Sequence, residues 1–362
     1  MKGFKLEKRD PVTGFKRALN PIVFVILAML FSSIFMVALS YNPIEVYVKM
    51  IQGAFGSWKG LSESIVYAIP LMLCGLGVSI SFKMSLNNIG AEGQFAMGAM
   101  AAAGVALFIP GIPGPLMIPL MVLAGFLAGA VWGAIAVIPK AFWGVNETII
   151  TLMMNYIALY FVDYLVYGPW RDTSGVNLPL SPVIPDEAKM SVLFGTRINT
   201  GVIIAIIVAV LIFLFFKYTT LGYQITVIGR SVKSAKYAGM NIVKNILIVM
   251  FISGGLAGLA GVTQVSGMVY RLQSNIANNA GFTAIIISYL SKFNPIIVLF
   301  VSVFFGGLTM GGYSVQVMGV PSQVVTMIQG SILVFVLGGE ILTRYRIILP
   351  KKKKSEKAGE VA

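Results

Sequence analysis

The chain has 362 residues, of which 57% are hydrophobic and only 11% are charged. Its mean hydropathy of +0.87 means that it carries far more apolar surface than a water-soluble core of this length can hide. The sequence therefore predicts an all-α polytopic membrane protein. The net charge of +14 could indicate a nucleic-acid partner, but basic residues that gather in loops beside apolar segments are better explained by membrane orientation.

Residue types that carry much enzyme chemistry are scarce. The sequence contains no histidine and a single cysteine, Cys74, which removes the commonest general base and any disulfide or cysteine metal cluster within one chain. It also contains no Gly-Lys pair, so the phosphate-binding loop of ATPases is absent. We therefore expect no catalytic residue, no metal and no cofactor in this chain.

Ten apolar segments follow one another along the chain, separated by charged residues, proline or glycine. A spanning helix needs about 20 mostly apolar residues, and most of the segments reach or approach that length. The exception is 282–293, where the following Pro295 favours a short or broken crossing, a feature of many transporters. The ten segments are 21–40, 64–82, 89–109, 116–138, 147–168, 200–216, 246–267, 282–293, 295–311 and 322–342.

The distribution of basic residues predicts the orientation, because cytoplasmic loops are enriched in Lys and Arg. With ten crossings, we expect residues 1–20 to form a basic cytoplasmic N-terminus, 21–342 the transmembrane domain and 343–362 a basic cytoplasmic tail. A re-entrant 282–293 would place Lys351 to Lys354 outside, against this bias. Of the 27 Lys and Arg residues, the ten-crossing map leaves outside only Lys49, Lys59, Arg171, Lys189, Arg197 and Arg271.

Glycines recur every four residues at two places. Gly125, Gly129 and Gly133 form one series, and Gly254 and Gly258 form another. Such spacing lets two membrane helices approach closely. Packing within this chain and contact with another subunit both remain open at this point.

Two segments outside the predicted spans are long enough to bind partners. The external loop 169–199 carries mixed charge, which suits either docking of a soluble protein or simple solvation. In the cytoplasmic loop 217–245, Ser231 to Tyr237 is predicted to form a short amphipathic helix that stops at Gly239. A short helix of this kind suits a groove on another protein.

The segment NNIGAEGQ, Asn87 to Gln94, places polar side chains where the chain enters a membrane helix. Hydrocarbon cannot hydrogen-bond these groups, so they need a protein partner, a helix end or a wet path. One interpretation is local: Asn88 caps the helix and Glu92 faces the positive end of its dipole. The other is a role in transport, and the two are compatible.

Three stretches together resemble a known family. They are SLNNIGAEGQ at 85–94, IGRSVKSAKYAGMN at 228–241, and AGFTAIIISYLSKFNP at 280–295 with FFGGLTMGG at 304–312. From about Leu71 to Gly338 the chain looks like the permease subunits of bacterial ATP-binding-cassette (ABC) importers for ribose, branched-chain amino acids and nucleosides. It departs from the family pattern at Arg230-Ser231, where Asn-Pro or a similar pair is usual.

The first stretch is similar to the F-N-I-G-x-E-G-Q motif of the nucleoside branch, whereas ribose permeases show an aspartate- and serine-based sequence there. The resemblance implies import of nucleosides across the cell membrane, with a simple-sugar (ribose or galactose type) permease as the alternative. It also implies a solute path near Asn87, Asn88, Glu92, Gln94 and Asn155.

The partners implied are a cytoplasmic ABC ATPase, a second homologous membrane subunit and an extracellular substrate-binding lipoprotein, with no nucleic acid. ATP would be used by the ATPase and not by this chain. The resemblance places the contact with that ATPase at Gly229, Arg230, Ser231, Ala235, Tyr237, Ala238, Gly239 and Met240.

An ion-coupled secondary transporter is a less favoured alternative, because it would need buried acids that are paired or open to a cavity. No basic partner is visible within the spans for the four acids in or at the edge of them, which are Glu92, Glu147, Asp163 and Glu340. If an aromatic ring stacked on a purine base, the candidates would be Phe82, Phe95, Tyr156 and Phe282, for which lipid contact is the competing interpretation.

Overall fold

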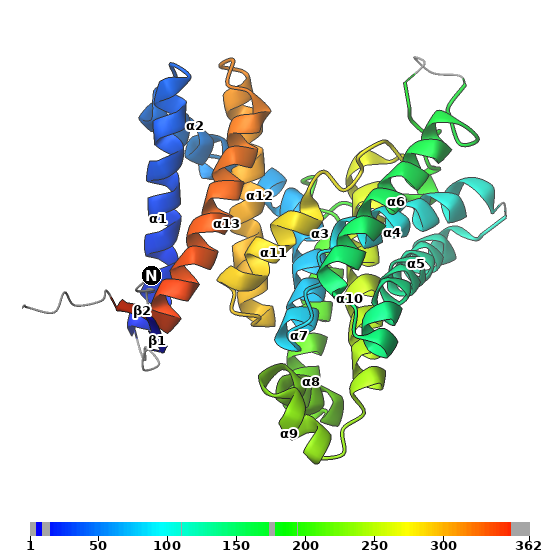
Figure 1. Cartoon of the computed structure of the whole chain (residues 1–362). Helices are drawn as coiled ribbons and strands as arrows, with labels where there is room; N and C mark the ends of the chain where they lie inside the picture. The colour runs from blue at the N-terminus through cyan, green and yellow to red at the C-terminus, as the bar shows by residue number, and fades with distance from the viewer. Residues whose placement is uncertain (1–4, 9–14, 110, 174–177, 194, 349–362) are drawn as a thin grey trace, which may run out of the picture. The chain divides into compact units, whose positions relative to one another are not determined.

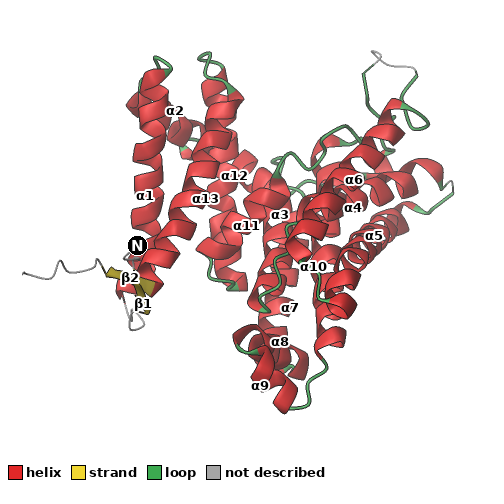
Figure 2. Cartoon of the chain, in the orientation of Figure 1, coloured by secondary structure: helices red, strands yellow, loops and turns green. Residues whose placement is uncertain are grey.

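The computed structural model describes residues 5–8, 15–109, 111–173, 178–193 and 195–348, and these are almost entirely helical (Figure 2). The chain divides into two compact units, one made of Met1–Leu39 with Met327–Ala362 and the other of Ser40–Thr326. The prediction of an all-α polytopic membrane protein is confirmed.

The first unit contains α1 (Phe15–Ala38) and most of α13 (Ser322–Arg344). Two strands that the sequence did not predict, β1 (Lys5–Lys8) and β2 (Tyr345–Ile348), pair antiparallel at the outer ends of these helices. This pairing holds the beginning of α1 and the end of α13 on the same side, in agreement with an even number of crossings.

The second unit is a bundle in which α3 and α10 are the most deeply buried spans (Figure 1). Its helices are α2 (Pro43–Phe55), α3 (Trp58–Lys83), α4 (Ala91–Phe108), α5 (Gly114–Trp143), α6 (Glu147–Tyr167), α7 (Gly201–Tyr218), α8 (Thr220–Arg230), α9 (Val232–Tyr237), α10 (Ile242–Gln264), α11 (Ala280–Leu290) and α12 (Pro295–Gln316). A π-helical turn, η2 (Val265–Val269), extends α10, and a 3-10 turn, η1 (Asp186–Ala188), lies in the loop after α6.

Eight described helices are long and apolar enough to cross a membrane, or nine if α1 and α2 together make one span. Seven of the eight lie in the second unit, the eighth, α13, begins there, and each matches a predicted segment. The short segment predicted at 282–293 is α11, whose 11 residues extend only about 16 Å. A helix of that length cannot cross the hydrocarbon region by itself.

The path of the chain nevertheless crosses the bundle at α11. On α12, Val298 lies against Gly75 and Gly306 lies against Ser64, so α12 runs antiparallel to α3 and begins where α3 ends. α10 also begins at that end, because Ser253 at its middle lies against Gly77, while Thr263 near its end and Ile69 of α3 both lie against Gly201. The chain must therefore return between α10 and α12, and it does so through an irregular stretch, 270–279, followed by α11. This agrees with the predicted broken crossing.

The glycine series joins α5 to α10. Gly125 and Gly129 of α5 lie against the backbone of Gly258, and Gly254 faces the carbonyl of Gly129. A Cβ at Gly129 would come within 2.8 Å of the Gly258 Cα. These glycines therefore pack within one chain, as one of the two sequence interpretations held.

The loop after α6 is packed on the end of α10 and η2. Ser181 N donates to Leu272 O at 2.9 Å and Met190 N donates to Ser266 O at 2.8 Å, while Arg197 pairs with Glu63 of α3 at 3.2 Å. Exposed Asp186 pairs with Lys189, which lowers the pKa of the Asp186 carboxyl. Residues 174–177 and 194 of the predicted external loop lie outside the described residues.

Candidate functional site

The polar motif between α3 and α4 forms a buried network with α10. Asn88 Nδ2 donates to Gln94 Oε1 and to Ser253 Oγ, both at 2.9 Å, and Gln94 Nε2 donates back to Asn88 Oδ1 at 3.1 Å. All three side chains are fully buried. Buried amides need such partners because an unmade hydrogen bond is costly. The network thereby fixes the loop 84–90 against the centre of the bundle.

Glu92 belongs to a second contact, with the start of α11. Its Oε1 accepts from Asn279 N and its Oε2 from Gly281 N, each at 2.7 Å. These N–H groups belong to the first turn and cap of α11, where a helix has unpaired donors and a positive dipole end. Gly281 has no room for a Cβ beside Glu92. The carboxylate therefore anchors the half-length helix.

The local capping interpretation is wrong in part. The N-cap of α4 is Gly90, which makes no side-chain cap bond, and Asn88 instead accepts from Gly90 N at 3.1 Å. Glu92 does lie in the first turn of α4, and its carboxylate also binds the N-terminus of α11. The missing cap of α4 comes from α6, where Asn155 Oδ1 accepts from Gly93 N and Nδ2 donates to Ile89 O, both at 2.8 Å.

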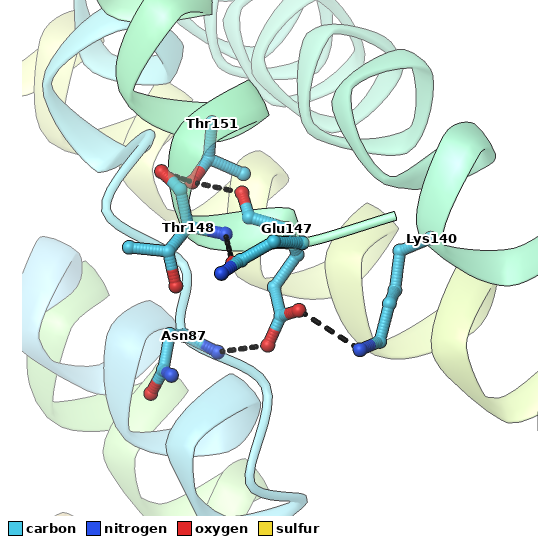
Figure 3. Close-up of polar contacts among 6 residues, drawn as sticks. Asn87, Lys140, Glu147, Thr148 and Thr151 are labelled. Carbon is cyan, nitrogen blue, oxygen red and sulfur yellow. Dashed lines mark hydrogen bonds and ion pairs between the residues drawn. The ribbon is translucent and has the colours of Figure 1, made fainter. Parts of the chain in front are cut away.

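A third contact ties the same loop to the turn between α5 and α6 (Figure 3). Glu147 Oε1 accepts from Asn87 N at 3.3 Å, and its Oε2 pairs with Lys140 Nζ at 3.1 Å. The carboxylate is buried while the ammonium is half-exposed. Glu147 therefore has a basic partner, which corrects the expectation that none lies near it. The partner, Lys140, was overlooked because it lies beyond the end of the predicted span 116–138.

The predicted coupling segment carries two helices. Ser231 caps α9, accepting from Ser234 N at 3.2 Å, and Gly239 takes a left-handed conformation (φ +73°) just after it. The predicted helix and its stop are confirmed. Ala235 is fully buried, whereas the Tyr237 side chain is 93% exposed. α9 thus buries the small side chain of Ala235 and exposes the aromatic ring of Tyr237.

α8, which the sequence did not predict, joins α9 to the polar motif. Ser85 Oγ donates to Gly229 O at 2.9 Å, and Gly229 lies so close to the Lys83 carbonyl that no Cβ fits between them. The loop 84–90 is therefore in contact with α8 on one side and with Ser253, Asn155 and Glu147 on the others. Only Gly permits this approach of two backbones.

The structure brings most of the predicted residues together around this loop. Asn88, Glu92, Gln94 and Asn155 are all buried and hydrogen-bonded to protein, whereas the Asn87 side chain is exposed. Arg230, Tyr237, Ala238 and Gly239 are exposed, and Gly229, Ser231 and Met240 are half-buried. Their roles in solute passage and ATPase contact stay predictions. Sequence reasoning missed Ser253 and Lys140, which carry no local signal.

Bundled membrane-length helices around a buried polar network define a polytopic membrane protein. The family model described as branched-chain amino acid transport system / permease component matches residues 60–337. The chain belongs to this permease family. It is a multi-pass cell-membrane protein and a permease subunit of the ABC importer type, a type that works with an ATPase and a substrate-binding protein.

Curated relatives are similar over nearly their whole length. The glucose ABC transporter permease TsgB13 of Haloferax volcanii is 33% identical over 95% of this chain and 93% of its own. The nucleoside ABC transporter permease NupB of Lactococcus lactis is 31% identical, covering 95% and 99%. The guanosine ABC transporter permease NupP of Bacillus subtilis is 30% identical, covering 93% and 97%.

Proposed function

We propose that this chain is the membrane-spanning subunit of an ATP-driven importer for nucleosides. The names of NupB and NupP and the NNIGAEGQ motif support nucleosides as the solute. The name of TsgB13 supports the second candidate, a simple sugar. Both solutes are neutral and rich in hydroxyl groups, so buried amides such as those of Asn88, Gln94 and Asn155 suit either.

The observation that carries the mechanism is the contact between α8 and the loop 84–90. A cytoplasmic ATPase would bind α9 through Tyr237 and the neighbouring coupling residues. Gly229 is in direct contact with the Lys83 carbonyl. A movement of α8 toward this carbonyl would therefore displace the loop 84–90. ATP-driven movement would then reach Asn88 and Glu92 without any ATP site in this chain.

The solute path would open where the buried network parts. In this conformation Asn88, Gln94 and Ser253 bond to one another. Separation of α10 from the loop would break the bond from Asn88 to Ser253 and open the Asn88 amide and the Ser253 hydroxyl to a nucleoside ribose. The solute would arrive from an extracellular binding lipoprotein and pass between this chain and a second membrane subunit.

Uptake by the reconstituted importer tests the proposal. The chain, its second membrane subunit, ATPase and binding protein are placed in liposomes and offered labelled guanosine, uridine, ribose or glucose. We expect nucleoside uptake that requires ATP and is unaffected by a protonophore. Sugar uptake alone would contradict the substrate class, and uptake without the ATPase or abolished by a protonophore would contradict the mechanism.

The ATPase contact has a matched control. Tyr237→Ala removes an exposed ring from α9, while Tyr218→Ala removes a ring that is 71% exposed at the end of α7, outside the predicted ATPase-contact residues 229–240. Exposed aromatic anchors often dominate binding. We expect Tyr237→Ala to weaken ATPase binding about tenfold or more and Tyr218→Ala to leave it nearly unchanged. Equal effects would remove α9 from the mechanism.

A further inference from the structure

One face of α6 carries a stripe of exposed tyrosines. Tyr156, Tyr160, Tyr164 and Tyr167 have side chains that are 50%, 70%, 63% and 61% exposed. Their spacing of four, four and three residues places them within an arc of about 80° on the helix surface, since each residue advances about 100°. We call these four residues the tyrosine stripe.

The stripe extends to the middle of the membrane. α6 has 21 residues, a length of about 31 Å, which is enough to span the hydrocarbon region. Tyr156 lies about 14 Å from the start of the helix by the same rise per residue. Tyrosines that face lipid concentrate at the two membrane interfaces, because hydrocarbon cannot bond a phenol. Lipid contact therefore does not account for Tyr156 and Tyr160.

Another span of this chain shows what a lipid-facing surface looks like. Apart from Tyr218 at its end, the exposed large side chains of α7 are aliphatic residues and one phenylalanine, without any hydroxyl: Ile203, Ile206, Ile207, Val210, Leu211, Phe213 and Leu214. Only the stripe and Tyr313 are exposed tyrosines within the described membrane-length helices, apart from Tyr218 at the end of α7. The face of α6 is therefore chemically distinct.

Asp163 adds an acid to the same region. It lies between Tyr160 and Tyr167 at the edge of the stripe, and its buried Oδ1 has no hydrogen-bond partner among the described residues. An ionisable residue within a membrane helix usually faces a bundle interior or a wet cavity. Its position supports a polar rather than a lipid environment for this face.

We propose that the tyrosine stripe lines the solute conduit and contacts the passing solute, a neutral ring compound rich in hydroxyl groups. This inference rests on the proposed function and assigns a second set of path residues to it. Aromatic faces stack on bases and phenols hydrogen-bond hydroxyl groups. Of the aromatic residues considered for stacking, Phe82 and Phe95 are buried in protein and Phe282 is half-buried, which leaves Tyr156 as the exposed one.

The composition of the stripe favours a conduit over a tight contact with a second membrane subunit. Helix contacts in membranes are enriched in Gly, Ala, Ser and Thr, which let backbones approach. The stripe has none of these, and the other exposed side chains of α6, Ile149, Met153, Ile157 and Phe161, are also large. Repeated, similar sites one helical turn apart also suit conduction, which requires several weak sites rather than one strong one.

Cysteine labelling in the assembled importer tests this assignment. Cys74 is the only cysteine and is fully buried, so single substitutions report on their own positions. Tyr156→Cys and Tyr160→Cys are compared with Ile207→Cys on α7, using a charged, membrane-impermeant methanethiosulfonate reagent that needs a hydrated thiolate. We expect the tyrosine positions to react at least tenfold faster than Ile207→Cys. Saturating guanosine, added with the binding protein, should slow the reaction of the tyrosine positions at least threefold.

Three results would overturn the inference. Labelling as slow as at Ile207→Cys would mean lipid contact, and cross-linking of the two positions to the second membrane subunit without protection by any solute would mean a subunit interface. Guanosine uptake that leaves labelling unprotected would refute the stripe while the proposed function stands. Protection by glucose or ribose instead would keep the stripe and refute the nucleoside assignment.

A conservative pair keeps the test independent of folding. Tyr160→Phe retains the ring and Tyr160→Leu removes it, and both are apolar enough for the membrane. We expect Tyr160→Phe to keep at least half of the uptake rate and Tyr160→Leu to raise KM at least fivefold, at equal amounts of assembled complex. Equal uptake kinetics in the two variants would contradict a stacking role.

Discussion

The backbone N–H of Gly281 donates to the carboxylate of Glu92 at 2.7 Å, joining residues 189 positions apart. Together with the bond from Asn279 N, this contact joins the first turn of α4 to the start of α11. The irregular half of the crossing, 270–279, ends at this contact. A carboxyl group buried at the start of a span thus has a structural partner, and its involvement in transport would require that partner to move.

Replacing Glu92 should therefore lower the stability of the protein, and this effect should be present whether or not solute is bound. In Glu92→Gln one amide oxygen can accept a bond, but the amide nitrogen faces a second donor. We expect a loss of about 1.5–3 kcal/mol, the value of a hydrogen bond to a charged group. The measurement is the temperature at which a fluorogenic maleimide reaches buried Cys74 in the purified complex.

Glu187→Gln is the matched control for that experiment, since Glu187 is an exposed acid in the loop after α6. It should leave the temperature of Cys74 exposure unchanged. A Glu92→Gln variant as stable as this control would show that the two 2.7 Å bonds contribute little.

The pair of Lys140 and Glu147 leads to an asymmetric prediction. Lys140→Ala leaves the buried Glu147 carboxylate with only Asn87 N as a partner, whereas Glu147→Gln leaves a half-exposed lysine that water can solvate. Removing the partner of a buried charge costs more than removing the charge itself. We expect Lys140→Ala to cost about 1–3 kcal/mol and Glu147→Gln less than about 1 kcal/mol.

The double variant tests whether the unpaired buried carboxylate of Glu147 causes the loss of stability in Lys140→Ala. In Lys140→Ala/Glu147→Gln no buried charge remains, so we expect part of the stability lost in Lys140→Ala to return, as measured by the same Cys74 assay. A double variant less stable than either single variant would show that the two residues act independently.

Sequence reasoning recovered the elements that depend on local signals. Apolar length located the spans, the Ser231 cap and Gly239 located α9, and glycine spacing located the contact of α5 with α10. It could not recover contacts between distant segments, such as Glu92 with α11 or Asn155 with α4, because each capping partner lies many residues away. α8 was missed because its 11 residues are too few for a membrane span, and the search for apolar length passed over the buried face that Gly222, Ile225 and Ile228 form.

The crossing of α5 and α10 should tolerate no side chain. In Gly258→Ala the new methyl would overlap the Gly125 carbonyl and approach the Gly129 Cα within 3.1 Å. Overpacking of a tight contact costs about 1–3 kcal/mol and more where backbone must shift. We expect a marked fall in folded protein, measured by monodisperse yield in detergent.

Gly330→Ala supplies the comparison, because Gly330 lies in α13 with no atom within 4 Å of the position of its Cβ. Alanine in an open helix position should stabilise by about 0.5–1 kcal/mol. Similar yields for Gly258→Ala and Gly330→Ala would mean that α5 and α10 can separate at little cost.

Gly229 offers the sharpest test of how movement would reach the polar network. Gly229→Val should push α8 away from the Lys83 carbonyl and weaken the bond from Ser85 Oγ, while α9 keeps its cap and its exposed Tyr237. We expect the ATPase to bind nearly as before, but solute uptake per ATP hydrolysed to fall at least fivefold. Tyr223→Ala, on the same helix with a 64% exposed side chain, should leave that ratio unchanged. If Gly229→Val lowered ATPase binding and uptake in equal proportion, α8 would serve to hold α9 rather than to transmit its movement.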